Sequence, residues 1–338
     1  IITSDWSSDV CSSDLKIKEG DEIRVIAPAR SASDIDEAVL ARAQTALESL
    51  GLKVSFSQYA FSRSQRGCPT DVEKVEDLHA AFLDPNVKGV LTAIGGFNSN
   101  QLLGRIDWDI IRANPKIFAG FSDITVLNHA ILAKTGLVTF ATPNFYCFGL
   151  PPKADYSLEY FRCCLFAGQP ETYRVRASKV FYDYAWDYDE KSPRSKITNG
   201  NPRIIQAGQA SGTLLGGNLC SLNLLNGTEY FPRIEGDIIL CLEDDSYDSI
   251  PATFERNLQS LIQQPYFRQV KAILFGRFQR ESIATDDSLI AMVCCKKINL
   301  DIPIVSNLDF GHTDPKFSYK IGGWASVEAY NECKLVLH

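Results

Sequence analysis

Short apolar runs alternate with stretches of helical spacing over the first part of the chain, from residue 22 to residue 143. The apolar runs predict strands at 22–29, 53–57, 87–94, 117–121 and 137–142. Between them, apolar residues recur three or four positions apart and predict helices at 34–50, 70–84 and 122–134. This alternation indicates a doubly wound, mostly parallel sheet with helices on both faces. Ligands of such sheets bind at the carboxyl ends of the strands.

Two helix boundaries are also marked by specific residues. Thr70 and Glu73 have the spacing of a capping box, in which each side chain bonds the backbone N–H of the other residue. Gly51 stands where the apolar spacing of 34–50 stops, as expected at the end of a helix.

The pattern changes in the middle of the chain. Residues 170–205 are polar and aromatic with little period, which predicts either a linker or a functional loop. From Ala207 onward, short strands and Gly-rich turns predominate, with helical stretches near 253–263 and 288–297. This second half is predicted to be a mixed α+β domain.

These patterns divide the chain into four predicted parts. Residues 1–15 repeat S-S-D without helical or strand period, and we interpret them as a non-native or disordered extension. An N-terminal α/β domain is expected at 16–165, a linker with an aromatic loop at 166–206, and a C-terminal domain at 207–338.

Composition narrows the possible partners. Hydrophobic residues make up 45% and charged residues 22%, as in ordinary globular proteins. The net charge is −7 and Lys and Arg form no basic block, so no nucleic-acid polymer is expected as a partner. Apolar runs are too short to span a bilayer, so no membrane association is expected.

The ten cysteines do not form the pattern of a disulfide framework. Two pairs are adjacent in sequence, Cys163-Cys164 and Cys294-Cys295, and no C-x-x-C occurs. Several others lie within apolar runs, where a thiol behaves as a small buried hydrophobe. We therefore expect a reducing, cytoplasmic location.

Ser122 stands at the turn between a predicted strand and a predicted helix, in F-A-G-F-S-D-I-T (118–125). Serine before an apolar helix is usually an N-cap. The same turn also suits a nucleophile, because a helix N-terminus favours negative charge. G-F-S-D-I contains only the first half of the G-x-S-x-G motif, so both interpretations stay open at this point.

A nucleophilic serine requires a base and an orienting carboxylate. His312 lies in the loop D-F-G-H-T-D-P after a predicted strand, a common place for catalysis, although a loop histidine is more often merely exposed. Glu243 ends the strand D-I-I-L-C-L-E and is a candidate for the carboxylate. The acidic run that it begins could instead be a solvated turn or a cation site, although the run lacks the spacing of a calcium loop.

Gly95 and Gly96 follow the strand predicted at 87–94. The sequence G-G-F-N is neither a dinucleotide fingerprint nor a P-loop, so it only weakly indicates phosphate binding. A glycine pair also lets backbone N–H groups face a ligand, which an oxyanion hole requires.

Seven separated motifs together resemble a known family. They occur in the order G-G-F-N-S-N-Q-L-L (95–103), G-F-S-D-I-T (120–125), G-L-V-T-F-A-T-P (136–143), G-G-N-L-C-S-L-N-L-L-N-G-T-E-Y-F-P (216–232), L-E-D-D (242–245), G-R-F (276–278) and D-F-G-H-T-D-P (309–315). They resemble serine peptidases of the LD-carboxypeptidase family, most closely its microcin C immunity branch, over residues 16–338.

The resemblance implies a Ser-Glu-His triad at the interface of the two domains. Ser122 matches the nucleophile, His312 the base and Glu243 the carboxylate that orients the base. Gly96 and Asp123 match the positions whose backbone N–H groups form the oxyanion hole. The resemblance also implies that no metal or other cofactor is needed, and that the protein is a homodimer.

Two substrate classes occur within the family. One is the murein tetrapeptide, from which D-alanine is released; the other is a peptidyl or aminoacyl nucleotide such as processed microcin C. In the microcin branch, tryptophans of a loop stack on adenine, and Phe181 and Trp186 stand at the corresponding positions. Asn98 is a further candidate for substrate binding. The aromatic residues could equally pack the loop on its domain.

Two other classes of function are considered. One is a non-catalytic two-domain binding protein, which would have no reason to keep Ser122, Glu243 and His312 together. The other is a cysteine hydrolase, for which Cys68, beside Pro69, is the nearest candidate although it lies on no comparable turn.

Overall fold

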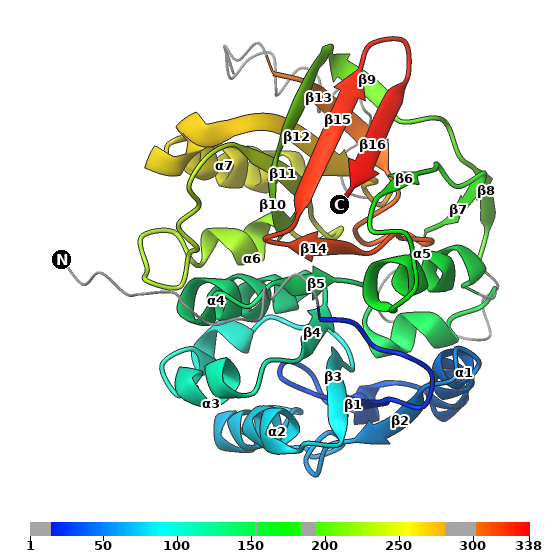
Figure 1. The fold of residues 1–338 in the computed structure, drawn as a ribbon, viewed down its shortest axis with the longest axis vertical. Helices are drawn as coiled ribbons and strands as arrows, with labels where there is room; N and C mark the ends of the chain where they lie inside the picture. The colour runs from blue at the N-terminus through cyan, green and yellow to red at the C-terminus, as the bar shows by residue number, and fades with distance from the viewer. Residues whose placement is uncertain (1–14, 153, 184–193, 281–301) are drawn as a thin grey trace.

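The structure is a computed structural model that describes residues 15–152, 154–183, 194–280 and 302–338. Two halves lie one above the other, each built on its own large sheet (Figure 1). The predicted extension falls outside the described residues except for Leu15, and so does the helix predicted near 288–297.

The N-terminal half contains the predicted parallel sheet. Its parallel strands are β1 (Glu22–Ile26), β2 (Lys53–Phe56), β3 (Val87–Thr92), β4 (Ile117–Gly120) and β5 (Thr139–Ala141). The sheet order is β14-β5-β4-β3-β1-β2. The edge strand β14 (Tyr319–Ile321) pairs antiparallel with β5 and comes from near the end of the chain.

Helices cover both faces of this sheet, as predicted (Figure 1). One face carries α1 (Glu37–Glu48) and α5 (Asp155–Leu165), and the other carries α2 (Asp71–Leu83), α3 (Trp108–Ala113) and α4 (Thr125–Thr135). The predicted capping box is present: the Thr70 side chain accepts from the Glu73 N–H, and Glu73 accepts from the Thr70 N–H.

The C-terminal half is built on a mixed sheet, as expected for an α+β domain. Its strands are β6 (Tyr173–Val175), β9 (Arg203–Gln206), β10 (Gly208–Asn218), β11 (Ile238–Glu243), β12 (Val270–Gly276), β13 (Ile304–Leu308), β15 (Trp324–Ala329) and β16 (Cys333–Leu337). The order is β6-β16-β15-β10-β11-β12-β13-β9, with β10 to β13 parallel.

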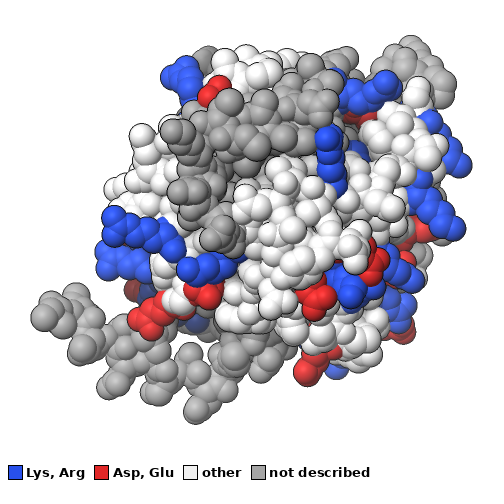
Figure 2. Space-filling model, turned by 90° about the horizontal axis from the view of Figure 1, so that it is seen from above, with Lys and Arg blue, Asp and Glu red and all other residues white. Residues whose placement is uncertain are grey.

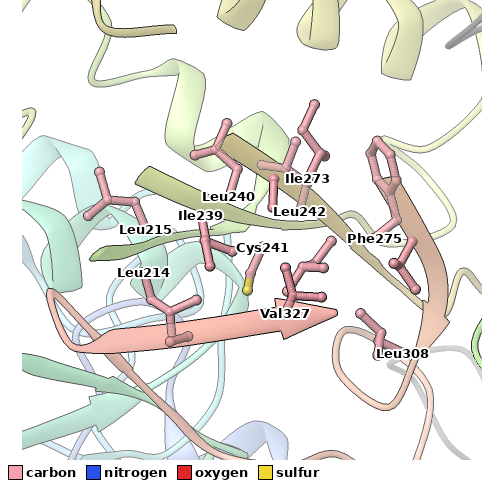
Figure 3. Close-up of a cluster of buried hydrophobic side chains, with 14 of the residues drawn as sticks. Leu214, Leu215, Ile239, Leu240, Cys241, Leu242, Ile273, Phe275, Leu308 and Val327 are labelled. Atoms are coloured by element: carbon pink, nitrogen blue, oxygen red, sulfur yellow. The ribbon is translucent and has the colours of Figure 1, made fainter. Parts of the chain in front are cut away.

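Helices α6 (Leu219–Asn223) and α7 (Pro251–Ile262) pack against this sheet. Figure 3 shows part of the core, where aliphatic side chains from β10, β11, β12 and β15 meet. The helix predicted near 253–263 is thus present as α7.

The segment predicted as a linker, 166–206, is only partly a connection. It supplies β6 and β9, the two edges of the C-terminal sheet. It also forms a separate hairpin of β7 (Val180–Tyr182) and β8 (Lys196–Thr198). The predicted domain limits stay a prediction, and strand β14 crosses them by joining the N-terminal sheet.

Hydrogen bonds join the two halves where β10 meets the start of α4. The N–H of Gly216 donates to His129 Nε2 at 3.1 Å, and the N–H of Asn218 donates to Thr125 Oγ1 at 3.0 Å. His129 is fully buried, and burial lowers its pKa to about 4, so the ring is neutral and can accept this bond. A Cβ on Gly217 would lie 2.5 Å from Thr125 Oγ1, so only glycine fits this contact.

Charged side chains of both signs are interspersed on the face seen in Figure 2, around an uncharged centre. None of the helices in the described part of the chain combines the length and apolar character needed to cross a bilayer. Within the same residues, no group of three or more His, Cys, Asp or Glu side chains is placed to hold a metal ion.

Candidate active site

Ser122 occupies a strained turn at the carboxyl end of β4. It is the first residue of a short 3-10 helix, Ser122–Ile124, and its φ is 67°. A non-glycine residue in this left-handed region costs about 1–3 kcal/mol and persists only where the surroundings impose it. The short helix has no side-chain cap, and the Ser122 hydroxyl bonds elsewhere. The structure therefore does not support the N-cap interpretation.

Three side chains from distant parts of the chain meet at this turn. Ser122 Oγ lies 3.0 Å from His312 Nε2, and His312 Nδ1 lies 2.6 Å from Glu243 Oε2. Glu243 is the last residue of β11 and is 2% exposed, whereas His312 lies in the loop after β13. All three stand near the carboxyl ends of parallel strands, as the topology predicts.

The carboxylate sets the hydrogen-bonding state of the histidine. A carboxylate only accepts, so Nδ1 carries the proton toward Glu243 and Nε2 is left to accept from the serine hydroxyl. Burial by itself lowers the pKa of His312, but the charge and the hydrogen bond of Glu243 outweigh it and raise the pKa above 6.5. The arrangement can move a proton from Ser122 to His312.

The Gly95-Gly96 loop approaches the serine from the end of β3. A Cβ on Gly95 would lie 3.0 Å from both Cβ and Oγ of Ser122, so a side chain there would crowd the hydroxyl. A Cβ on Gly96 would press on Ala29 and Arg30 behind the loop. The N–H of Asp123 lies in the first turn of its helix, where no intrahelical acceptor exists.

A cavity of about 260 Å³ opens over these groups. It is lined by Arg30, Ile94, Gly95, Gly96, Phe97, Phe121, Ser122, Asn144, Tyr146, Asp245, Asp248 and His312. The cavity therefore contains the serine, the histidine and the glycine loop together. Its size suits a small ligand or part of a larger one.

Among the residues predicted to bind substrate, Asn98 does not line this cavity. It is 2% exposed, and its Oδ1 accepts from the ammonium of Lys74 at 3.0 Å. Its own N–H donates to Asp123 Oδ2. Because its side chain faces the protein interior beneath the loop, we do not assign it to the substrate.

Phe181 lies on β7 and is not among the residues that line this cavity. The guanidinium of Arg277 is 4.6 Å from its ring centroid. The next residue, Tyr182, exchanges two backbone hydrogen bonds with Asp314, at 2.7 and 3.0 Å. The aromatic hairpin is thereby attached to the loop that carries His312. Trp186 lies outside the described residues.

Several residues of the cavity wall were not predicted from the sequence. Asp245 and Asp248 line it from the loop after β11, and Phe97 lines it from the glycine loop, where it is 73% exposed. The run E-D-D (243–245) at the end of β11 was an available signal for Asp245, whereas Asp248 lies beyond it. Arg30 and Tyr146 carried no comparable sequence signal.

Comparison with known proteins places this arrangement in a family. Residues 23–142 match the LD-carboxypeptidase N-terminal domain, and residues 211–327 match the LD-carboxypeptidase C-terminal domain. The chain belongs to the LD-carboxypeptidase family. It is therefore a hydrolase of the serine carboxypeptidase type, as the sequence motifs predicted, and the interpretation as a non-catalytic binding protein is wrong.

Relatives of the family align over nearly the whole chain. YocD of Bacillus subtilis (strain 168), named as a carboxypeptidase, is 46% identical over 93% of this chain and 95% of its own length. The microcin C7 self-immunity protein MccF of Escherichia coli is 32% identical over 77% of this chain and 76% of its own.

Solved structures of the family share the fold. The MccF-like protein from Bacillus anthracis str. Ames has a TM-score of 0.91 and 41% identity, covering 96% of this chain and 98% of its own. MccF in complex with aspartyl sulfamoyl adenosine has a TM-score of 0.84 and 27% identity, with the same coverage.

Proposed function

We propose that Ser122 is the nucleophile, His312 the general base and Glu243 the carboxylate that orients it. The observation that carries this proposal is the continuous hydrogen-bonded chain from Ser122 Oγ through both ring nitrogens of His312 to Glu243, at 3.0 and 2.6 Å. Ser122 Oγ would attack the scissile carbonyl carbon while His312 Nε2 takes its proton. His312 would then donate that proton to the leaving group, and water would hydrolyse the acyl-enzyme.

The negative charge that develops on the carbonyl oxygen needs donors that are already in place. We propose the backbone N–H groups of Gly96 and Asp123 for this role. Support comes from their position: Gly96 lines the cavity beside Ser122, and the Asp123 N–H begins the short helix at that turn.

For the substrate we propose a peptidyl or aminoacyl nucleotide, cleaved at the bond that joins the acyl group to the nucleotide. Detoxification of compounds like processed microcin C would be the purpose. Support comes from the likeness to MccF, structures of which contain aspartyl sulfamoyl adenosine and glutamyl sulfamoyl guanosine. Phe181 and Trp186 would stack on the base, and because Arg277 lies against the Phe181 ring, stacking would use the opposite ring face.

The second candidate is a murein tetrapeptide, from which terminal D-alanine would be released. It is favoured by the likeness to the murein tetrapeptide carboxypeptidase of Pseudomonas aeruginosa, which is 28% identical over 90% of this chain and 92% of its own. The two candidates use the same reaction and differ in the leaving group.

We further infer a cytoplasmic location and a homodimer. The location is supported by the seven cysteines of the described residues that the structure shows as free thiols, four of them buried. The homodimer rests on the family resemblance.

One parallel assay tests the chemistry and separates the substrates. Purified enzyme and Ser122→Ala are incubated with a peptidyl adenylate and with a murein tetrapeptide, and the products are quantified by mass spectrometry. We expect adenylate cleavage by the unaltered enzyme and a loss of at least about 10⁴-fold in Ser122→Ala, with an unchanged melting temperature. D-alanine release without adenylate cleavage would favour the murein candidate. Activity retained in Ser122→Ala would exclude this serine as the nucleophile.

A further inference from the structure

A charged lysine side chain is buried beneath the glycine loop. Lys74 lies on α2 and is 1% exposed, which makes it one of the largest fully buried side chains of the protein. Its ammonium donates to Asn98 Oδ1 at 3.0 Å. Lysine is almost never fully buried unless an anion or several acceptors compensate the lost hydration. The neutral amide of Asn98 alone does not provide that compensation.

Asn98 connects this lysine to the carboxyl group of Asp123, which is 1% exposed. Asp123 Oδ2 accepts from the N–H groups of Asn98 and Ser99, both at 3.0 Å. In return, Ser99 Oγ donates to the backbone carbonyl of Asp123 at 2.8 Å. These bonds join the loop after β3 to the turn after β4.

The charge of Asp123 depends on these neighbours. Burial raises the pKa of the Asp123 carboxyl, and the bonds from Ser99 and Asn98 and the positive charge of Lys74 offset only part of that rise. Its Oδ1 is buried and has no hydrogen-bond partner among the described residues, so the two bonds from the loop both end on Oδ2. A carboxylate bonded in this way holds its donors more strongly than a neutral acceptor would.

The joined segments are the two that carry the proposed oxyanion donors. Gly96 lies two residues before Asn98, and the second donor is the N–H of Asp123 itself. We propose that the side chains of Lys74, Asn98 and Asp123 form a buried clamp that fixes the position of the Gly96 N–H relative to the Asp123 N–H. Lys74 and the Asp123 carboxylate are thus positioning residues for transition-state stabilisation, an inference that rests on the proposed function.

If the clamp positions the two donors, its loss should lower the catalytic rate and have little effect on substrate binding. The two N–H groups act on the oxyanion, which exists only in the transition state, so their misplacement lowers kcat and leaves KM nearly unchanged. A merely structural role would lower the folded fraction and leave kcat per folded molecule intact.

Lys74→Met tests this directly, because it removes the ammonium and keeps the length of the side chain. We expect kcat per folded molecule to fall by about 10- to 100-fold, with KM within about twofold. The rate of Ser122 labelling by a fluorophosphonate probe should fall by a similar factor. The phosphonate oxygen of the tetrahedral adduct would accept hydrogen bonds from the same two donors, the N–H groups of Gly96 and Asp123. Folded fraction is measured by thermal unfolding.

Lys116→Met is the matched control. Lys116 is also a buried lysine of the N-terminal half, but its ammonium donates to the carbonyls of Ala81 and Asp84, at the end of α2 away from the glycine loop. This control should lose stability without losing kcat. If Lys74→Met has the same kcat and labelling rate as the control, the clamp is excluded.

If Lys74→Met does not fold, Lys74→Met/Asp123→Asn serves instead, because it removes both buried charges. We expect this pair to be more stable than Lys74→Met and still slower than Lys116→Met, since a neutral amide holds the loop less firmly. A pair variant as fast as the control would overturn the clamp. Failure of the proposed function looks different: the unaltered enzyme would then neither hydrolyse substrate nor be labelled at Ser122.

Discussion

His312 receives two opposing influences, and their balance determines when it can act as a base. The ring is largely buried, which disfavours its charged form, yet it lies 2.6 Å from a carboxylate that favours it. The second influence is the stronger, so the pKa of His312 lies above its ordinary value of 6.5. In the proposed mechanism, the neutral ring is the active form, so activity depends on pH through this group.

We predict that kcat/KM falls as pH decreases through the raised pKa of His312, because protonation removes its ability to accept the Ser122 proton. In Glu243→Gln the anion is lost, burial then dominates, and the acidic limb moves to lower pH. The plateau rate should drop by about 10⁴-fold. The measurement is a kcat/KM profile between about pH 5 and 9 for both proteins. An acidic limb that stays in place would show that Glu243 does not control this histidine.

At the scale of elements, we expect the contact between β10 and α4 to align the candidate site. Strand β10 lies beside β11, which ends at Glu243, and it touches α4 directly after the turn that carries Ser122. Gly217 lies in this contact, with no room for a Cβ beside Thr125, and has a φ of 127°. Gly217 of G-G-N-L therefore permits the approach of β10 to α4, whereas a Cβ on Gly216 would meet the backbone of Cys241 in β11.

Gly217→Ala should push α4 and β10 apart, because its Cβ would lie 2.5 Å from Thr125 Oγ1. Gly227→Ala is the control: Gly227 also has a positive φ, of 77°, but nothing lies within 4 Å of its added Cβ. We expect Gly217→Ala to lose about 1–3 kcal/mol more of the free energy of unfolding than the control, by overpacking. It alone should also lose kcat. Denaturant unfolding and kinetics of both variants check this, and equal losses would argue against an alignment role.

At the scale of elements, some features of the fold and the site could be predicted from the sequence and others could not. The parallel strands, the α2 capping box and the placement of Ser122, Glu243 and His312 near strand ends follow from periodicity, capping chemistry and motif order. Strand β14 could not be predicted, because three residues of Y-K-I carry no period and their partner is chosen by tertiary contact. The φ of Ser122 and the burial of Lys74 were equally inaccessible, since both result from neighbours distant in sequence.

For the whole molecule, the shared strand and the β10 contact couple the two halves. The C-terminal strand β14 completes the N-terminal sheet, and His129 of α4 accepts a hydrogen bond from β10. Neither half can lose its structure without removing buried contacts of the other.

We predict a single cooperative unfolding transition of the described two-sheet body. Calorimetric and van't Hoff enthalpies should agree, because a shared sheet leaves no stable intermediate. Fluorescence of Trp108 in α3 and of Trp324 in β15, each observed with the other tryptophans replaced by Phe, should give the same midpoint. Two midpoints that differ would mean that the halves unfold independently.

Strand β14 also has a consequence for biosynthesis. When the ribosome has completed β5, the strand that will cover its edge has not yet been made, and translation proceeds at about 5–20 residues per second. During that interval the nascent sheet has an open edge that can pair with other chains. Glu243 and His312 also emerge long after Ser122, so in the proposed mechanism the nascent serine cannot acquire full reactivity early. Newly made chains should therefore depend on chaperones until synthesis is nearly complete.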